Sequence, residues 1–525
     1  MDRINIAGAG IAGLSAAIAL AEKGIPSLLI SVQPSERAQS VMAEGGINAC
    51  LDTMGEHDTV EEHFRDTMKG GVFIADEDAV RSLTSHAPEM IDFLERIGVP
   101  FNRENGHVIQ RNFGGQKKKR TAFARSSTGK IIMSALIDEV RRYEAAGLVR
   151  RLCHHNVTGI DIRRTDSGLS CEGLWLCDTY TDRMYYSRGH VIAAWGGMNG
   201  LFPGHTTGTA ANTGRLTADV FLRGVTLSDL EFIQYHPTTV DIGSKRLLLT
   251  EAARGEGGKL FIERDGKPWY FMEELYPESG SLSPRDVVSR EMYRVCQRDD
   301  CKPPVYLDMR MIDKPTWESK LSDLRSWIIY HLGTDPVKEP VAVSPGIHFF
   351  MGGIDVDKRH RTDAVGLYAA GECACQYHGA NRLGGNSLLG ALWGGRQAAY
   401  TAAEETGECE NGEPAAVGES EGFDVTAYDA GAAEMCGILV SGLGIVRDEQ
   451  TMRSALDRLD GFADAHRDDP LHAGAVLGQA MLLSALARRE SRGAHSRSDH
   501  PQRDDERFGR RTYCRYKDGK IQIQI

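Results

Sequence analysis

A glycine-rich turn near the N-terminus constrains the fold of this chain most strongly. An apolar run, Ile4–Ala7, is followed by Gly8, Gly10 and Gly13 in a Gly-x-Gly-x-x-Gly spacing, and residues 15–24 then form a small-residue helix pattern that ends on a glycine. A strand, a tight turn and a helix in this order aim backbone N–H groups and the positive helix end at a pyrophosphate. Gly8 permits the turn, Gly10 lets a phosphate approach, and Gly13 lets the helix pack on the strand. This predicts a dinucleotide-binding unit, although the spacing alone also fits an ordinary strand-to-helix turn.

Two later stretches repeat the pattern of an apolar strand followed by glycine. Residues 191–197 run into Gly196, and residues 366–372 end on Glu372. In an adenine-flavin fold, that terminal carboxylate would accept hydrogen bonds from ribityl hydroxyls. Because the three strand-glycine sites lie far apart along the chain, we expect one nucleotide-binding domain that is interrupted by an insertion.

The second predicted strand, residues 26–31, ends on Ser31. Dinucleotide sites often carry Asp or Glu at this point to hold the ribose, so we expect weaker selection of an adenosine ribose here. The next segment, residues 37–46, is small, polar and rich in glycine, which suits a loop that presses against a flat ligand. Without other context, it would fit a plain surface loop equally well.

Composition and charge exclude several classes of protein. The chain has 525 residues, 41% hydrophobic and 26% charged, which is typical of a soluble globular protein of two to four domains. No apolar run approaches the ~20 residues of a membrane helix. The first strand begins too early for a signal peptide, so the cytoplasm is the expected location. A net charge of −12 argues against a nucleic-acid partner. Any anionic ligand must therefore be held by locally clustered cations.

The eleven cysteines show no metal-binding pattern. They include no C-x-x-C pair, and Cys373 and Cys375 are too close in sequence for the usual zinc spacing. The odd number and the scattered positions favour reduced thiols. We therefore predict no metal site and no iron–sulfur centre in this chain.

Helical periodicity covers residues 59–69 and 77–97, and the basic run 117–120 is expected to be a solvated patch. A Gly/Glu/Pro-rich linker is expected at 410–422, amphipathic helices at 426–489, and an irregular, charged tail from residue 491. The predicted division is a FAD-binding domain at 1–236 and 347–408, a capping domain at 237–346, a helical domain at 423–490 and a C-terminal tail at 491–525.

Five separate islands carry side chains that could form an anion-binding redox site. They are Gln234-Tyr-His236-Pro, Thr250-Glu251-Ala-Ala-Arg254-Gly, Ser-Pro-Arg285-Asp, His348-Phe-Phe-Met-Gly-Gly and His378-Gly-Ala-Asn381-Arg382. Each alone is more often structural, because a single histidine is usually a core or surface group and an arginine usually forms a surface ion pair. Their shared position in glycine-flanked stretches, where backbone can approach a ligand, favours a functional site.

These islands resemble the flavoprotein subunit of succinate dehydrogenase and fumarate reductase, with L-aspartate oxidase as a near relative. The resemblance extends from the first glycine turn to about residue 505 and includes the late segment 488–495. It implies an α/β fold with a Rossmann-like FAD-binding domain, an inserted α+β capping domain and a C-terminal helical domain. It also implies that the capping domain closes a dicarboxylate over the flavin.

The resemblance assigns roles residue by residue. Hydride would pass from flavin N5 to one alkene carbon, Arg285 would protonate the other, and Glu251 and Arg254 would relay the proton. A guanidinium, with a pKa above ~12, is an unusual acid, so this role depends on the resemblance alone. The implied substrate contacts are His236, Thr250, Glu251, His348, Arg382, Phe113, Gln116 and Gly46. The implied cofactor contacts are Gly8, Gly10, Ile11, Ala12, Gly13, Ser31, Val32, Arg37, Ser40, Gly45, Gly46, Gly196, Glu372, Arg382, Asn386, Ser387 and Leu388.

The chain departs from the family's pattern at several positions. Gln39 stands where many members carry a histidine bonded covalently to the flavin, so we expect dissociable FAD and a bias toward fumarate reduction. Phe113 stands where aspartate oxidases place a glutamate for the substrate ammonium, and an unpaired buried ammonium would cost several kcal/mol. Trp195 and Arg215 replace residues of two cofactor-binding turns, which puts the adenosine contacts in question.

The favoured interpretation is an FAD-dependent enzyme that interconverts fumarate and succinate. The alternatives are an L-aspartate oxidase, a reductase of a related unsaturated acid, and a flavin-binding assembly subunit without turnover. The resemblance further implies a separate iron–sulfur subunit and a membrane anchor, which would bring the chain to the inner face of the cell membrane without inserting it. The sequence leaves the electron donor, the physiological direction and the oligomeric state open.

Overall fold

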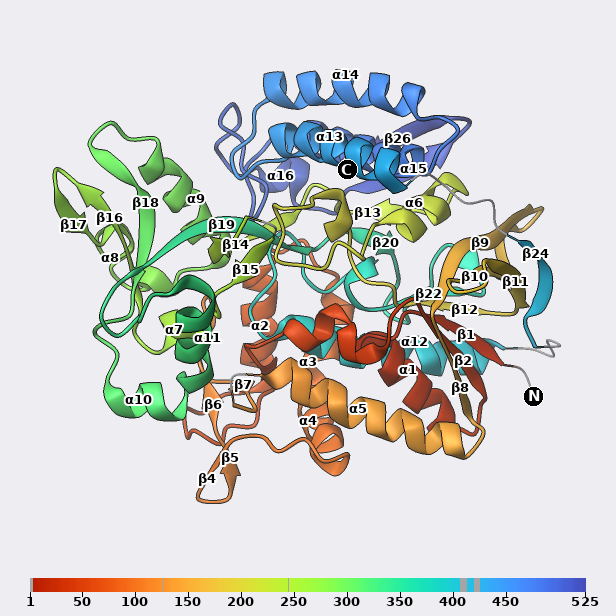
Figure 1. Ribbon diagram of the computed structural model, residues 1–525, viewed down its shortest axis with the longest axis horizontal. Helices are drawn as coiled ribbons and strands as arrows, with labels where there is room; N and C mark the ends of the chain where they lie inside the picture. The colour runs from red at the N-terminus through yellow and green to blue at the C-terminus, as the bar shows by residue number, and fades with distance from the viewer. Residues whose placement is uncertain (1–2, 126, 244, 407–412, 420–424) are drawn as a thin grey trace.

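A five-stranded parallel sheet brings the three strand-glycine sites side by side (Figure 1). Its strands, in spatial order, are β22 (Leu367–Ala369), β12 (Val191–Ala193), β1 (Ile4–Ala7), β2 (Ser27–Ser31) and β8 (Val149–Cys153). Ala7 is in register with Ala193, and Ala193 with Ala369, so the chain leaves all three strands at the same edge of the sheet. This confirms that distant segments build one nucleotide-binding domain. The computed structural model describes residues 3–125, 127–243, 245–406, 413–419 and 425–525.

Three helices cover one face of this sheet. They are α1 (Ile11–Glu22), α5 (Thr128–Ala145) and α12 (Asn386–Glu405), and α1 packs against both of the others. The first helix begins four residues before the predicted start and ends next to Gly24, whose φ of +72° allows the chain to reverse. A Cβ atom at Gly395 would lie 2.2 Å from the carbonyl oxygen of Ala12. This glycine therefore permits the close approach of α1 and α12.

The segment before α5 corrects two predictions. The expected helix at 77–97 is two helices, α3 (Glu77–Ser85) and α4 (Ala87–Arg96), because Pro88 opens a new first turn. The basic run at 117–120 is only partly a solvated patch, since Arg120 is fully buried and bridges Asp58 and Asp66 at 2.8 Å each. Burying that guanidinium requires both carboxylates.

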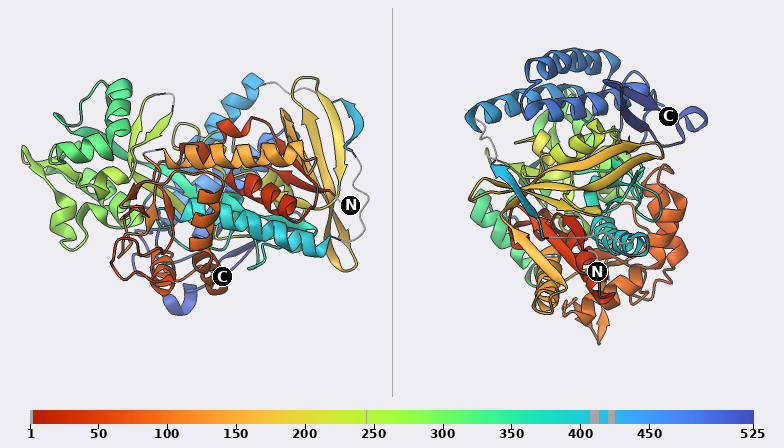
Figure 2. Two further views of the ribbon diagram at one scale, coloured as in Figure 1. Left: turned by 90° about the horizontal axis from the view of Figure 1, so that it is seen from below. Right: turned by 90° about the vertical axis from the view of Figure 1, so that its right-hand side faces the viewer.

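An antiparallel six-stranded sheet forms the scaffold of the inserted segment. Its order is β15 (Arg246–Leu248), β14 (Ile233–Asp241), β19 (Val341–Phe350), β18 (Cys301–Asp308), β16 (Lys259–Arg264) and β17 (Lys267–Trp269). The predicted boundaries at 237 and 346 fall inside β14 and β19. Because these two strands pair, the chain enters and leaves the insertion through neighbouring strands. The insertion forms one end of the molecule, away from the parallel sheet (Figure 2, left).

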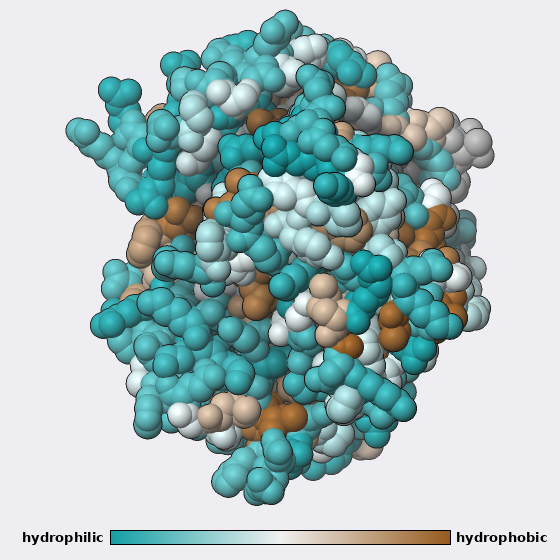
Figure 3. Space-filling model, turned by 90° about the vertical axis from the view of Figure 1, so that its left-hand side faces the viewer, coloured by the Kyte–Doolittle hydropathy of each residue, from teal (hydrophilic) through white to brown (hydrophobic). Residues whose placement is uncertain are grey.

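Five helices pack around this second sheet: α7 (Ala252–Gly255), α8 (Phe271–Leu275), α9 (Arg285–Cys296), α10 (Lys314–Ser319) and α11 (Ser322–Leu332). Figure 3 faces this end of the molecule and shows a largely hydrophilic surface with small, separate apolar patches. Scattered apolar side chains of this kind are normal for a protein surface.

The C-terminal part has more structure than predicted. The expected helices are α13 (Val425–Gly442), α14 (Glu449–Ala465) and α15 (Leu471–Ala487), which form a layer across the molecule (Figure 2, right). The tail from residue 491 was expected to be irregular, and this holds for residues 491–504, which contain no helix or strand, but not for the end of the chain. Two arginines of the tail are buried and paired, Arg492 with Glu490 and Arg497 with Asp499, whereas most of its other charged side chains are exposed. The last residues form strands β25 (Tyr513–Lys517) and β26 (Lys520–Gln524).

The predicted linker at 410–422 contains a strand. β24 (Ala415–Glu419) pairs with β11 (Arg183–Arg188), whereas residues 410–412 and 420–422, and the predicted boundaries at 408 and 423, lie outside the described residues. No helix among the described residues is long and apolar enough to cross a bilayer.

The remaining elements complete four further sheets among the described residues and their connections. The strands are β3 (Ile47–Asn48), β4 (Arg103–Glu104), β5 (His107–Val108), β6 (Gln110–Arg111), β7 (Thr121–Ala122), β9 (His155–Thr165), β10 (Gly168–Asp178), β13 (Leu227–Ser228), β20 (Gly353–Asp355), β21 (Ala364–Val365) and β23 (Ala374–Cys375). The helices are α2 (Val60–Gly70), α6 (Arg215–Leu222) and α16 (Asp505–Phe508).

Candidate active site

Glycines at the carboxyl edge of the parallel sheet form a cradle, around Gly8, Gly10 and Gly13, in which an added side chain at Gly8 or Gly13 would clash with backbone. A Cβ atom at Gly8 would lie 2.2 Å from the carbonyl oxygen of Ala194, at a φ of +117°. At Gly13 it would lie 1.8 Å from the carbonyl oxygen of Gly8. The first helix begins at Ile11, whose N–H donates to Ser40 Oγ at 3.3 Å. The predicted cofactor contacts Gly10, Ile11 and Ala12 therefore lie at a positive helix end.

A second helix begins close to the first. The α12 N-terminus follows Gly385, whose φ is +84°, and its first residue is Asn386. The Asn386 side chain is engaged within the protein, since its oxygen accepts from Asn48 at 2.7 Å and its nitrogen donates to Thr67 at 3.0 Å. Asn386, Ser387 and Leu388 offer a ligand the backbone N–H groups of the first turn.

Glu372 lies on the glycine-rich edge between the two helices. Its carboxylate accepts the Phe350 N–H at 3.1 Å, and a Cβ atom at Gly197 would come within 2.6 Å of it. Burial raises the pKa of Glu372 to about 7. The nearby Asn199 Nδ2 is buried and has no hydrogen-bond partner among the described residues. These groups fit a ligand with hydroxyls, such as the ribityl chain of FAD.

The other predicted cofactor residues divide into two groups. Gly45 and Gly46 pack closely against other segments of the chain. A Cβ atom at Gly45 would lie 2.8 Å from the Phe113 ring, and one at Gly46 would lie 2.5 Å from the Ala122 carbonyl oxygen. Gly196, at a φ of +83°, is packed against Asn212. By contrast, Ser31 is half-buried at the end of β2, and Val32 and Arg37 are exposed.

The two predicted histidines come together from paired strands. His236 lies on β14 and His348 on β19, and their ring centroids are 5.1 Å apart in an edge-to-face arrangement. Burial, together with the Arg285 guanidinium, holds the pKa of both rings well below the usual range. Both imidazoles are therefore neutral, and the buried His236 Nε2 has no hydrogen-bond partner among the described residues.

Glu251 is the centre of a buried charge cluster. It accepts from Arg285 Nε at 2.8 Å and from the Gly114 N–H at 3.1 Å, and Arg254 lies 3.3 Å away. Burial raises the pKa of the Glu251 carboxyl, but the Arg285 and Arg254 guanidiniums outweigh it and hold this pKa below its usual value. The carboxylate is thus ionised between two cations, an arrangement through which a proton could move.

Arg382 approaches the cluster from the loop before α12. Its guanidinium stacks 4.5 Å from the Phe349 ring, next to His348, and its Nε is buried without a hydrogen-bond partner among the described residues. Burial and the Arg285 charge hold the pKa of Arg382 well below its ordinary value. Among the site residues, three guanidiniums face a single carboxylate, so the site favours an added anion.

Sequence analysis named Gln234 and Asn381 only as neighbours, and the structure gives them a role. Gln234 accepts from Arg285 at 3.0 Å and donates to the Asn381 side chain and the Arg382 carbonyl at 2.8 Å each. Asn381 in turn donates to Asp286 at 2.9 Å. The chain of bonds fixes Arg285 relative to Arg382, and its only signal in sequence is that both amides flank predicted residues.

The remaining predicted substrate contacts border this cluster. Phe113 is buried and lies so close to Gly384 that a Cβ there would sit 2.7 Å from the ring. Gln116 donates to the Gly384 carbonyl at 2.8 Å, and Thr250 is buried immediately before Glu251. The structure therefore gathers the predicted substrate residues from both the FAD-binding and inserted segments.

Three of the four residues that depart from the family's pattern make hydrogen bonds within the protein. Gln39 Oε1 accepts the Thr209 N–H at 2.8 Å. Trp195 donates to Thr217 at 3.1 Å, and the exposed Arg215 donates to the Thr158 carbonyl at 3.3 Å.

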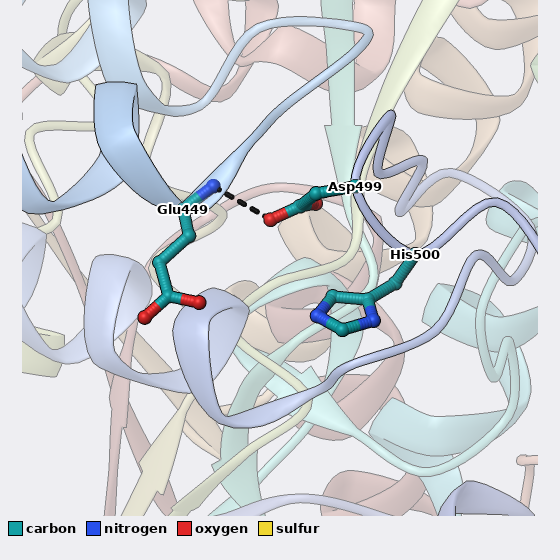
Figure 4. A group of neighbouring side chains, drawn as sticks. All are labelled: Glu449, Asp499 and His500. Atoms are coloured by element: carbon teal, nitrogen blue, oxygen red, sulfur yellow. Dashed lines mark hydrogen bonds between the residues drawn. The ribbon is translucent and has the colours of Figure 1, made fainter.

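One group of possible metal ligands occurs among the described residues, away from this site. The ligand atoms of Glu449, Asp499 and His500 lie within 4.8 Å of one another (Figure 4). However, the Asp499 carboxylate is bound by Arg497 and by the Glu449 N–H at the start of α14, and the Arg497 hydrogen bond lowers its pKa to about 2. These contacts are those of a helix cap.

Known proteins share this architecture over almost the entire chain. A family model described as FAD binding domain matches residues 4–388, and one described as fumarate reductase flavoprotein C-term matches residues 470–525. The succinate dehydrogenase flavoprotein subunit of Bacillus subtilis is 35% identical, covering 98% of this chain and 94% of its own length. The fumarate reductase flavoprotein subunit of Mycobacterium tuberculosis is 34% identical, covering 99% and 96%.

A solved structure agrees with these matches. A mutant of the quinol fumarate reductase of E. coli superposes with a TM-score of 0.86 at 29% identity, covering 100% of this chain and 97% of its own. The glycine cradle, the buried Glu372 and the cationic cluster beside them are consistent with an FAD-dependent oxidoreductase. The chain therefore belongs to the family of FAD-binding flavoprotein subunits of succinate dehydrogenase and fumarate reductase.

Proposed function

We propose that this protein interconverts fumarate and succinate and acts mainly as a fumarate reductase. The observation that carries the proposal is a buried excess of cationic and N–H donor groups. Arg254 and Arg285 share the carboxylate of Glu251, Arg382 is acted on by Glu251 and Glu372, and His236 offers an unpartnered nitrogen. A small dianion would neutralise these groups and satisfy their donors. A C4 dicarboxylate has one carboxylate for each side of such a cluster.

Each carboxylate would have its own set of donors. In this proposal His348 and Arg382, whose guanidinium stacks on Phe349, bind one carboxylate, and His236 and Thr250 bind the other. A guanidinium can bind a carboxylate through two parallel hydrogen bonds. Neutral imidazoles add N–H donors without requiring a further buried charge. Together these donors would withdraw electrons from the conjugated double bond and make it electrophilic.

FAD, when bound across the glycine cradle, supplies the hydride at N5. The protein's own contribution is the second hydrogen, which Arg285 would deliver as a proton to the adjacent carbon. Glu251 contacts both Arg285 and Arg254, so it can return a proton to Arg285 after each turnover. Arg254 donates to the Ser281 carbonyl at 2.6 Å, which fixes the outer end of this relay.

The proposed direction rests on Gln39. An amide cannot form the covalent bond that a histidine makes to the flavin in many relatives, and such a bond tends to raise the flavin potential. Without it, the bound cofactor would be the stronger reductant. We further propose that electrons come from a separate iron–sulfur subunit with a membrane anchor, because the relatives are named as flavoprotein subunits. Such partners would hold the protein at the inner face of the membrane.

Anaerobic reoxidation of the bound flavin tests the proposal. The protein is loaded with FAD, reduced with dithionite, and mixed with fumarate while the flavin absorbance is followed. We expect the flavin colour to return, with one succinate formed per flavin. Failure of fumarate to reoxidise the flavin, together with oxygen-dependent oxidation of L-aspartate, would overturn it in favour of an aspartate oxidase. Aspartate would have to place its ammonium beside the apolar Phe113, so we expect no such turnover.

A further inference from the structure

Two threonines that are not among the predicted substrate contacts each lie close to the Nδ1 atom of one active-site histidine. Thr238, two residues after His236 on β14, places its backbone nitrogen 3.3 Å from His236 Nδ1. Thr207, in the loop before α6, places its hydroxyl 2.8 Å from His348 Nδ1. A neutral imidazole carries its proton on one nitrogen only, so a donor at Nδ1 decides what Nε2 can do.

For His236 the donor is unambiguous. A backbone N–H can only donate, so His236 Nδ1 must accept and the ring proton must be on Nε2. The Thr238 hydroxyl lies 3.4 Å from Nδ1 but donates its own proton to the Leu249 carbonyl at 2.9 Å, so the shorter 3.3 Å contact of the backbone N–H sets Nδ1 as the acceptor. His236 therefore presents an Nε2–H, the same atom that is buried without a partner among the described residues.

For His348 the contact lengths favour the hydroxyl as the donor. The Thr207 hydroxyl has two acceptors within reach, His348 Nδ1 at 2.8 Å and the Ile347 carbonyl at 3.5 Å. That carbonyl also accepts the Thr207 N–H at 2.9 Å. The shorter contact favours donation to Nδ1. The neighbouring Thr206 forms a bridge with Ile347, which ties the threonine loop to the strand that carries His348.

We infer that Thr207 and the Thr238 backbone N–H set the tautomers of His348 and His236, so that both neutral rings offer an Nε2–H to the substrate. Thr207 is then a positioning residue. This inference rests on the proposed dicarboxylate function.

The tautomer of each ring matters because the surrounding positive charges prevent the rings from binding an anion as protonated imidazoliums. Arg285 and Arg382 act on both rings, and His236 also lies near Arg254, so an added imidazolium would be strongly disfavoured. A neutral ring with the opposite tautomer would aim an Nε2 lone pair at a carboxylate oxygen. The threonine donors select the one neutral form that attracts the anion.

A hydroxyl deletion with its conservative rescue tests the role of Thr207. In Thr207→Val, which keeps the side-chain shape, we expect the KM for fumarate to rise about tenfold, the value of one hydrogen bond, with kcat within about threefold. Thr207→Ser should restore the KM, because it returns the hydroxyl. Thr165→Val, on an exposed hairpin, removes a hydroxyl elsewhere and should change neither constant. An unchanged KM in Thr207→Val would overturn the inference.

Imidazole ¹⁵N spectra give a readout independent of turnover. Signals that are missing in His348→Asn and His236→Asn identify the two rings in the FAD-loaded protein. We expect unprotonated Nδ1 and protonated Nε2 in both rings, and a lost hydrogen bond at His348 Nδ1 in Thr207→Val. Protonated Nδ1 in either wild-type ring would refute the assignment. If the wild type shows the expected tautomers but does not reduce fumarate, the proposed function fails and the tautomer assignment stands.

Discussion

At the scale of single residues, the site depends on a carboxylate that separates two guanidiniums. Glu251 contacts Arg285 and Arg254 in a buried environment, so its charge is needed both to hold them and to pass a proton. In Glu251→Gln, we expect fumarate reduction to fall by about 10²–10⁴, the usual contribution of a proton-transfer group. The free energy of unfolding should fall by about 3–5 kcal/mol, because two cations lose their partner. Steady-state kinetics and chemical denaturation measure these effects separately.

The control for this variant is Glu278→Gln, which makes the same change at an exposed position. It should leave both activity and stability near the wild-type values. Wild-type turnover in Glu251→Gln would remove Glu251 from the proton relay.

Gln39 leads to a prediction about the cofactor. Its side-chain oxygen is occupied by the Thr209 N–H, and an amide offers no nucleophile for a bond to the flavin. We expect acid precipitation of the yellow holoprotein to leave FAD in the supernatant and a colourless pellet. Flavin that stays with the precipitated chain, or that migrates with it in a denaturing gel, would contradict this prediction.

Sequence reasoning found the charged site residues but missed those that orient them. His236, Arg285 and Arg382 stand in recognisable islands, and the structure brings them together. Thr207 could not be found in this way, because it approaches His348 across a distance of 141 residues and a lone threonine in a loop carries no pattern. Arg120 was misjudged for a similar reason: its partners, Asp58 and Asp66, are remote in sequence.

At the scale of elements, the close packing of the first strand, turn and helix requires glycine at its contact points. In Gly13→Ala, the new Cβ would meet the Gly8 carbonyl oxygen at 1.8 Å, and backbone cannot move aside as a side chain can. We expect the turn to open and FAD affinity to fall at least tenfold, measured by fluorescence titration of free FAD. The matched control is Gly461→Ala in α14, where a Cβ meets nothing within 4 Å. It should leave FAD affinity unchanged and stabilise the helix by up to about 1 kcal/mol.

Element prediction succeeded where the local pattern was strong. The run Ile4–Ala7 is a strand with the predicted bounds, and the start of α1 differs only because Ile11 continues the helix back to the turn. The prediction for the C-terminal tail failed at its end, where two strands form. It also missed that Arg492 is buried between Glu490 and Asp505, because such pairing is decided by tertiary contacts.

At the scale of the whole molecule, buried histidines set the response to acid. Six of them have pKa values below the ordinary value of about 6.5 because burial disfavours their charged form. They are His63 and His378 at about 3, His360 at about 4, and His236, His348 and His495 well below their usual range. Several buried carboxyls act in the opposite sense, since burial raises the pKa values of Glu44 and Glu372 to about 7 and also raises those of Glu231, Asp286 and Asp355.

The sign of the pH dependence follows from these shifts. Below pH 6.5 the unfolded chain binds protons at the six histidines while the folded chain does not, so stability is lost as the pH falls. Each lowered histidine costs on the order of 2 kcal/mol by pH 5. The raised carboxyls take up protons in the folded state at a higher pH than in the unfolded chain and recover only part of this loss. We expect the melting temperature of the FAD-loaded protein to fall steadily from pH 7 to pH 5.

A single variant tests whether the histidines are the cause. His63 is fully buried, and its Nε2–H donates to the Asn386 side-chain oxygen at 3.2 Å. In His63→Gln, an amide can keep that hydrogen bond, but one titrating group is gone. Between pH 5 and 6.5, the slope of the unfolding free energy against pH should therefore decrease by the contribution of about one bound proton, roughly 1.4 kcal/mol per pH unit. An unchanged slope would show that acid sensitivity arises elsewhere, whatever the absolute stability of the variant.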